Sequence, residues 1–429
     1  MKDRQPTQPG RVKLTPENGT NPFYAIMEMA DEPTEIGTPP TKANLLQDET
    51  EFALFGNLAD RTVNDAFVGV AAELRTIRLR LDSVSTMSVT LRSTQGNALP
   101  GVYIQGMFDE NGNTCITNSA GVASGYVSEG SVAIGVTGYA DIVDYTETFT
   151  ATAGADYTKV LTVTTRNFLK VTTSKNVKFS GNVSRLDVTV VGGGGGAGGA
   201  GAKGNSSDEA ATGGGGGGGA VVVQENVTFT SNTQYAASIG AGGAHGTSTV
   251  NSNGTAGSSG GTTTFMGLSA TGGGGGGGAT VGWVSASQGI KGGTAGVGVG
   301  GGNGGAGVWS RGVSGSGTQI TNGNAGSNGK AGYSSFTETV LYGAGGGSGS
   351  TGESTNGIGG AGGTYGGGKG GNCTYNVSQL NGTAGTAGSG SGGGSSGYYV
   401  FYAGDQWTFG TSAKGGSGCV AIRMHLKFA

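Results

Sequence analysis

The chain has 429 residues, 96 glycines, eight prolines and a net charge of −3 at pH 7. Because no basic run is present to neutralise a phosphate backbone, we expect no nucleic acid partner. All the prolines lie at or before Pro100, so the glycine does not belong to a collagen triple helix, which needs proline along its length. No apolar run approaches the roughly 18 residues of a membrane span, and the N-terminus lacks the apolar segment of a signal peptide.

Residues 1–62 mix prolines, charges and turn residues, as in "ADEPTEIGTPPTKANLL". Such a segment buries little core of its own, so we predict an arm that a partner orders.

The next segment, 63–84, has apolar side chains at spacings of three and four, which is typical of an amphipathic helix. These positions form a hydrophobic seam of Phe67, Val70, Leu74, Ile77, Leu81 and Val84. As heptad a and d positions they predict a short coiled coil, most simply a parallel homotrimer. The alternative is a helix that packs on its own domain, and both readings stay open.

From Ser85 the apolar period changes to two, with Met87, Val89 and Leu91 alternating with polar residues. An Asn-Gly turn in "DENGN" and several further short strands follow. This pattern predicts an Ig-like β-sandwich over 85–165. The stretch "ALPGVYIQGMF" resembles the carboxypeptidase-regulatory-like Ig folds that serve as spacers in surface and virion proteins.

The remaining residues, 166–429, combine strands with glycine tracts. Only 16 of the 96 glycines precede residue 190, so the last 240 residues contain 80 of them. Strands are predicted in "SRLDVTVVG", "AVVVQENVTFTSNTQYAASIG", "GTTTFMGLSATG" and "GCVAIRMHLKF". Together with the preceding segments they predict a mostly β chain with an N-terminal arm and short helix.

The glycines repeat with a period of three, at 192, 195, 198, 201 and 204, with a second column at 193, 196 and 199. The period returns at 357, 360, 363 and 366, and at 359, 362, 368 and 371. Three residues per turn is the repeat of the polyproline II helix, which has no internal hydrogen bonds. We therefore predict a polyglycine-II-like bundle whose helices bond to one another. A flexible glycine–serine linker is the alternative, although linkers do not carry interleaved strands.

Large aromatic residues lie in or beside the glycine loops. Trp283, Trp309, Tyr399 and Trp407 are the candidate receptor contacts, because large rings among small flexible residues are typical of recognition surfaces. The alternative is that they cap the hydrophobic ends of the bundle.

Catalytic and metal-binding patterns are missing from the sequence. Asp109 begins a segment like a calcium loop, but Thr114 and Ala120 stand where that loop needs glycine and a carboxylate. His245 and His425 are far apart, and Cys115, Cys373 and Cys419 form no metal or disulfide pattern. We therefore predict a protein that is not an enzyme, without cofactor or metal and with reduced thiols.

Two stretches carry a resemblance to a known family. The stretch "ADEPTEIGTPPTKANLLQDETEFALFG" resembles the N-terminal segment of tail-fibre and receptor-binding proteins of phages and prophages of Firmicutes. The stretches "LDVTVVGGGGGAGG", "YAASIGAGGAHG" and "GGSGCVAIRMH" look like the glycine-rich domain of phage tail fibres and tail-tip adhesins. The resemblance implies that residues 1–62 attach to a tail or baseplate protein of the virion, and that residues 166–429 bind a glycan or protein receptor on the bacterial surface.

Such a fibre is synthesised in the host cytoplasm without a signal peptide, which agrees with the N-terminal sequence. A bacterial glycine-rich extracellular or cell-wall structural protein is the main alternative. A surface-glycan depolymerase is a weaker one, because no suitable pair of carboxylates is found.

Overall fold

A computed structural model provides the coordinates. It describes residues 12–16, 25–29, 84–203, 209–281, 290–291, 296, 298, 301–311, 321–351, 357–374, 377–401 and 406–427. The chain divides into two compact units, and each is described by itself. The first comprises Met1–Ser85 with Ser128–Gly130 and Ala151–Ala155, and the second comprises the remainder.

In the first unit, β1 (Val12–Pro16) pairs antiparallel with β2 (Ala25–Met29). The rest of the predicted arm, and residues 63–83 of the predicted helix with its seam, lie outside the described residues. Val84 was expected to close that seam, but it begins strand β3 instead. The reason is that the burial alternation of the strand, in which every second side chain is buried, is already established at Ser85.

The fold is mostly β, as predicted, and the described part of the chain has a single short helix, α4 (Val377–Leu380). A seven-stranded, nearly closed sheet has the order β8-β7-β4-β6-β3-β9, with β5 paired to β4. Its strands are β3 (Val84–Ser93), β4 (Tyr103–Phe108), β5 (Thr114–Ile116), β6 (Val122–Ser128), β7 (Gly130–Val136), β8 (Tyr145–Ala151) and β9 (Asp156–Val163). The edge strands β8 and β9 approach each other through Phe149 and Tyr157, whose ring centroids are 5.2 Å apart.

The glycine-rich region begins with two four-stranded sheets, which we call the base. One has the order β10-β27-β12-β15 and the other β11-β16-β18-β19. The first contains β10 (Phe168–Val171), β27 (Cys419–Leu426), β12 (Val183–Val191) and β15 (Val221–Val227); the second contains β11 (Lys175–Lys178), β16 (Gln234–Ser238), β18 (Thr263–Phe265) and β19 (Leu268–Ala270). One hydrophobic core joins the two sheets, with Phe179, Leu186, Val188, Phe265 and Ile422 fully or almost fully buried. The strands predicted here are confirmed.

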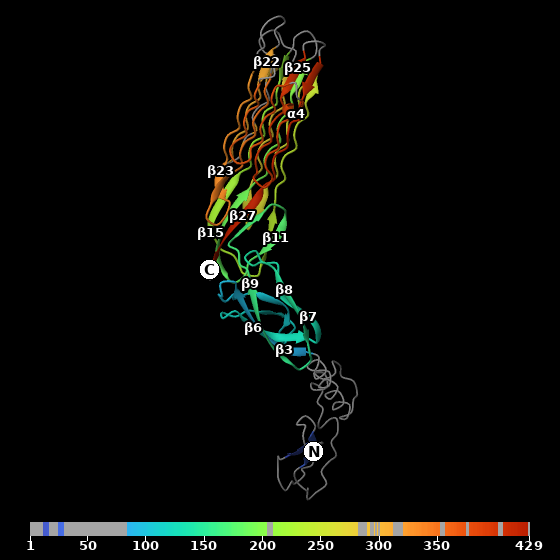
Figure 1. The fold of residues 1–429 in the computed structure, drawn as a ribbon, viewed down its shortest axis with the longest axis vertical. Coiled ribbons are helices and arrows are strands. Elements are labelled where there is room, and N and C mark those ends of the chain that lie inside the picture. Colours follow the sequence, from blue (N-terminus) through green and yellow to red (C-terminus); the bar gives the residue numbers. More distant parts are fainter. Residues whose placement is uncertain are drawn as a thin grey trace, which may run out of the picture. The chain divides into compact units, whose positions relative to one another are not determined.

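The base strands continue into extended segments that run side by side away from the base (Figure 1). We call these segments the glycine bundle; they comprise residues 192–200, 212–220, 239–248, 253–262, 271–279, 301–308, 321–329, 343–351, 357–364, 367–374, 381–388, 389–397 and 409–418. The hairpin of β23 (Lys330–Tyr333) and β24 (Thr339–Tyr342) lies at the base end of two of them.

Hydrogen bonds in the bundle rotate with a period of three. The N–H groups of Gly192, Gly195 and Gly198 donate to the carbonyl oxygens of Ala220, Gly217 and Gly214, at 2.8–3.0 Å. The N–H groups of residues 193, 196 and 199 donate to segment 253–262, and those of 194 and 197 donate to segment 409–418. A helix with three residues per turn points successive N–H groups in three directions. The predicted polyglycine-II-like bundle is therefore confirmed.

Segment 192–200 also accepts hydrogen bonds from three further neighbours, through residues of 243–249, 273–279 and 389–397. It is thus surrounded by six segments and fully buried. A Cβ atom added to Gly195 would overlap the carbonyl oxygen of Gly274, and one added to Gly196 would overlap that of Ala244. None of the glycines in 192–200 has a positive φ. Glycine is therefore required here for close approach of backbones and not for unusual backbone angles.

Serine hydroxyls replace backbone groups inside the bundle. Ser395 is fully buried; its Oγ accepts the N–H of Gly349 and donates to the carbonyl oxygen of Gly213, both at 2.7 Å. Ser412 Oγ likewise donates to Gly198 at 2.7 Å. Because these hydroxyls both accept and donate, they satisfy buried polar groups where the direct backbone bond is not made.

At the bundle surface, asparagine side chains satisfy backbone N–H groups in a similar way. The side-chain oxygens of Asn322 and Asn328 accept the N–H groups of Ile358 and Thr364, at 2.9 and 2.8 Å. These two asparagines are six residues apart, so they lie in one column of the three-residue repeat. A segment at the edge of the bundle has fewer neighbours than an interior segment. There the side-chain amide oxygen accepts the hydrogen bond that a backbone carbonyl oxygen accepts in the interior.

Candidate functional site

Short strands gather at the end of the bundle opposite the base, which we call the far end. In Figure 1, β22 and β25 lie there, whereas β11, β15, β23 and β27 lie at the base. The far-end strands are β13 (Gly201–Lys203), β14 (Glu209–Ala211), β17 (Thr249–Val250), β20 (Thr280–Val281), β21 (Ile290–Lys291), β22 (Trp309–Arg311), β25 (Tyr398–Phe401) and β26 (Gln406–Phe409). β13 pairs with β14, β20 with β21 and β25 with β26, so the chain turns back toward the base at each of these hairpins.

Two small hydrophobic clusters close the bundle beneath the far end. Tyr398 is buried with Ala202 and Ala210, and its ring lies 6.2 Å from that of Phe409. The Tyr398 hydroxyl donates to the carbonyl oxygen of Ala210 at 3.4 Å, so the polar end of this buried ring has an acceptor. These contacts fix the hairpin β25–β26 against β13 and β14.

Of the four predicted contact residues, the structure describes the side chain of Tyr399 alone. Trp283 lies outside the described residues. Trp309 begins β22 opposite Ala211, and Trp407 lies in β26; their side chains also lie outside the described part. Tyr399 is 6% exposed and packs with Cys373 and Leu380 in the second cluster, a position that favours the core alternative for this ring. Contact by the three tryptophans stays a prediction.

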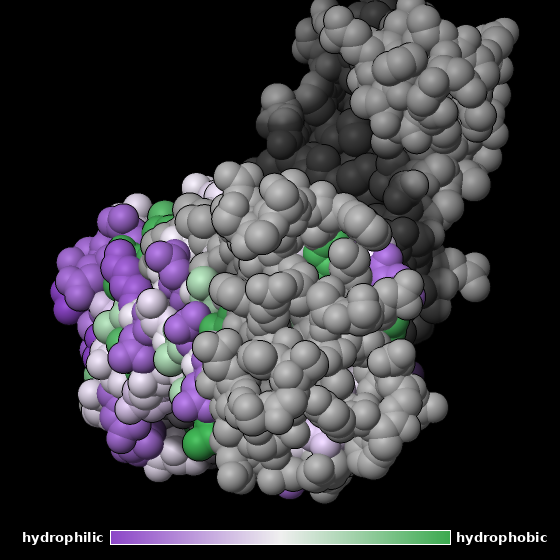
Figure 2. Space-filling view, turned by 90° about the horizontal axis from the view of Figure 1, so that it is seen from above, coloured by the Kyte–Doolittle hydropathy of each residue, from purple (hydrophilic) through white to green (hydrophobic). Residues whose placement is uncertain are grey.

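Two exposed apolar side chains at the far end were not predicted from the sequence. Val250 in β17 is 45% exposed, and Ile358, next to the bridge between Gly357 and Cys373, is 59% exposed. Single apolar residues in polar tracts carry no periodic signal, which is why they were missed. In Figure 2, which looks onto this end, the described surface is mostly hydrophilic, with hydrophobic residues scattered singly.

The described residues offer little for catalysis or redox chemistry. Within those ranges no three His, Cys, Asp or Glu side chains lie close enough together to hold a metal ion. The thiols of Cys115, Cys373 and Cys419 are all buried. Burial raises the pKa of Cys419 to about 12, so its thiol stays protonated and is a poor nucleophile. The helix that the structure describes is too short and polar to cross a membrane.

In the described part of the chain, this geometry defines a mostly β protein whose central element is a polyglycine II bundle rising from a two-sheet base. The chain belongs to the glycine-rich domain family, whose model matches residues 170–425. No curated protein matches the chain.

Among solved structures the chain is similar to the Bacillus anthracis TIE protein. The identity is 17%, the match covers 26% of this chain and 22% of that one, and the TM-score is 0.17. The chain thus spans about a fifth of the length of that protein, and a likeness this limited carries no argument about function.

Proposed function

We propose that the protein is an adhesin, a phage or phage-like tail fibre that binds the bacterial surface through the far end of its glycine bundle. The observation that supports this most is the separation of the two ends of the bundle. The base holds both β12 and β27, by which the chain enters and leaves the bundle, and the far end holds the hairpins β13–β14, β20–β21 and β25–β26.

This separation suits recognition for a physical reason. Segment 192–200 is held by backbone groups of six neighbours, so the bundle is a stiff support that does not depend on the sequence of the connections at its far end. Binding residues are commonly found on such connections, because their variation leaves the scaffold intact. The far-end connections can therefore change with the receptor while the glycine columns stay constant.

The remaining assignments follow from the resemblance of the N-terminal segment, from the heptad pattern of the seam, and from the resemblance of the next segment to Ig-like spacers. Residues 1–62 attach to a tail or baseplate protein, residues 63–84 join three copies, and residues 85–165 act as a spacer. The protein then belongs to the virion. A glycine-rich extracellular or cell-wall protein of bacteria would share the bundle but would have no receptor on a foreign cell.

Adsorption of the fluorescently labelled full chain to a panel of bacterial strains tests this proposal. We expect saturable binding to a subset of strains. We then replace Trp283, Trp309 and Trp407 by alanine one at a time. Where the tryptophan anchors the receptor, its loss should weaken binding by about 2 kcal/mol or more, because buried aromatic rings dominate the energetics of recognition.

Tyr365→Ala is the matched control. Tyr365 is an aromatic side chain that is 59% exposed, and it lies at the turn between segments 357–364 and 367–374. The preceding Thr364 donates its N–H to Asn328, two residues before the base strand β23, so this turn lies toward the base. Its removal should leave adsorption unchanged. If all three tryptophan variants fold and adsorb like the parent, the far end is not the receptor-binding surface. If the parent protein binds to no strain, the result favours the alternative of a cell-wall structural protein.

A further inference from the structure

Asparagine side chains join the outer segments of the glycine bundle to one another in six places within the described ranges. In each, the side-chain oxygen accepts a backbone N–H of another segment at 2.7–3.0 Å. The six pairs are Asn253 with Val281, Asn303 with Gly298, Asn322 with Ile358, Asn328 with Thr364, Asn372 with Gly359, and Asn381 with Thr411. All of these asparagines except Asn372 immediately precede a glycine.

The glycine that follows the asparagine completes the contact. Gly323 donates its N–H to the carbonyl oxygen of Ile358 at 2.9 Å, and the N–H of the same Ile358 is bound by Asn322. Gly382 likewise donates to the carbonyl oxygen of Thr411 at 3.0 Å. The Asn-Gly dipeptide therefore binds both backbone groups of one residue, and this contact defines which residue lies opposite it.

Backbone hydrogen bonds alone do not define the register of such segments. A helix with three residues per turn presents equivalent N–H and C=O groups in every repeat, so a segment shifted by one repeat, about 9 Å, would find equivalent partners. The asparagines are not repeated in this way. In segment 321–329 the column of Asn322 and Asn328 has Ala325 between them. A shift of one repeat would leave at most one of the two side-chain bonds in place.

The same segment is also fixed on a second side. The side-chain nitrogen of Asn324 donates to the carbonyl oxygen of Ala306 in segment 301–308 at 2.8 Å. Segment 321–329 thus has asparagine contacts with both 357–364 and 301–308.

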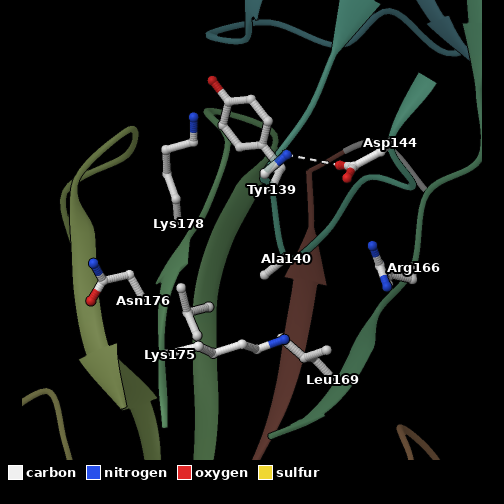
Figure 3. Close-up of a pocket in the computed structure, with 10 residues that line it drawn as sticks. Tyr139, Ala140, Asp144, Arg166, Leu169, Lys175, Asn176 and Lys178 are labelled. Atoms are coloured by element: carbon white, nitrogen blue, oxygen red, sulfur yellow. Dashed lines mark hydrogen bonds between the residues drawn. The ribbon is translucent and has the colours of Figure 1, made fainter. Parts of the chain in front are cut away.

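Asparagine acts differently in the base, where the strands pair through a β ladder. Figure 3 shows Asn176 on β11, beside a pocket of about 190 Å³. Its amide nitrogen donates to the side-chain oxygen of Gln234 at 3.1 Å, and the two residues lie on the paired strands β11 and β16. A slip of one residue in this ladder would bring the buried Val177 to the surface, so burial fixes the register. The glycine columns have no such alternation.

We propose that the asparagines of the outer segments set the register of the bundle. They add a bond that occurs only at certain residues to a backbone pattern that is the same in every repeat. A single polar residue selects the register of a coiled coil in the same way. Because a slip of one repeat would displace the end of a segment by about 9 Å, these positioning residues keep the connections at the far end aligned.

Disulfide trapping in the full chain tests the register directly. Ala325 and Ala361 are exposed and lie side by side, because Gly326 donates its N–H to the carbonyl oxygen of Ala361 at 2.9 Å. Ala325→Cys with Ala361→Cys therefore reports the observed register. Ala325→Cys with Ile358→Cys or with Thr364→Cys reports a shift of one repeat in either direction. In the observed register these mismatched positions are offset by about 9 Å, beyond the roughly 7 Å between Cα atoms that a disulfide spans.

We expect the matched pair to form its disulfide readily in the parent and the mismatched pairs to form theirs slowly. Asn322→Ala combined with Asn328→Ala should raise the mismatched yield about fivefold or more, the value of one net hydrogen bond. Asn322→Asp combined with Asn328→Asp should restore the parent result, because a carboxylate oxygen also accepts an N–H. Ser327→Ala, which removes an exposed hydroxyl from the same segment, should change nothing.

The proposal is overturned if the mismatched disulfides form equally fast with asparagine and with alanine at positions 322 and 328. Exchange protection of the Gly195 amide checks that the bundle stays folded. If the alanine variant loses this protection, the asparagines hold the whole bundle together rather than set its register, which also overturns the proposal. Neither cells nor a receptor take part in the assay, so its outcome is independent of the adhesin proposal.

Discussion

Replacing Gly195 by alanine should strongly destabilise the glycine bundle, although the change adds a single methyl group. Gly195 is buried, donates its N–H to Gly217 at 2.8 Å and accepts one from Gly393 at 3.0 Å. The new Cβ would overlap the carbonyl oxygen of Gly274. That oxygen cannot withdraw cheaply, because it already accepts the N–H of Gly217.

We expect a loss of about 4 kcal/mol or more, which is at the upper end for point substitutions. The melting temperature of the bundle should then fall by more than about 8 °C in a calorimetric scan. Ala244→Val is the matched control, because Ala244 lies in edge segment 239–248 and is exposed. It should cost no more than about 0.5 kcal/mol. Equal melting temperatures for the two variants would contradict the packing described here.

The second large effect is expected from Ser395→Ala. The substitution leaves the buried N–H of Gly349 and the buried carbonyl oxygen of Gly213 without the hydroxyl that joins them. An unsatisfied buried polar group costs about 1–3 kcal/mol, so the free energy of unfolding should fall by about 2–4 kcal/mol.

Denaturant titration measures this difference directly. Ser259→Ala removes a hydroxyl from an exposed edge position in segment 253–262 and should change the free energy of unfolding by less than about 0.5 kcal/mol. If Ser395→Ala proves as mild as Ser259→Ala, the interior serines are spacers and not hydrogen-bonding members of the bundle.

The strands and the period of the bundle could be predicted because both leave local patterns. Val188, Val190 and Val191 precede a glycine tract whose three columns face three different neighbours, and the columns are visible in the sequence. The identity of those neighbours is not visible, since segment 192–200 bonds to residues more than 200 positions away, such as Gly416. Glycine carries no side chain that distinguishes one partner from another.

The turn inside a uniform glycine tract could not be predicted from the sequence either. The glycine columns at 357–366 and 359–371 give no sign of a turn, but the chain reverses at Tyr365 and Gly366, both with positive φ. Tyrosine is not a residue that signals such a turn. The run therefore forms two segments, 357–364 and 367–374, which bond to each other through Gly360 and Gly370.

Serine-rich composition was ambiguous for a similar reason. "GSGSGGGSSG" at 388–397 is typical of a flexible linker, yet Ser391, Ser395 and Ser396 are fully buried. At the far end, the sequence identified candidate aromatic residues but could not distinguish rings that contact a receptor from rings that are buried in the core. The burial of Tyr399 depends on Cys373 and Leu380, which lie 19 to 26 residues away in the chain and provide no local signal.

Residue-resolved hydrogen exchange in segment 253–262 tests the central structural claim most directly. The N–H groups of residues 254, 257 and 260 donate to segment 271–279, and those of 255, 258 and 261 donate to segment 239–248, at 2.8–3.0 Å. Those of Ala256 and Ser259 have no acceptor within the described ranges, and both residues are exposed. The bundle therefore predicts two slow amides followed by one fast amide, repeated every three residues. Alternation with a period of two would indicate a β-strand, and uniformly fast exchange would indicate a disordered linker; either result would contradict a polyglycine II bundle.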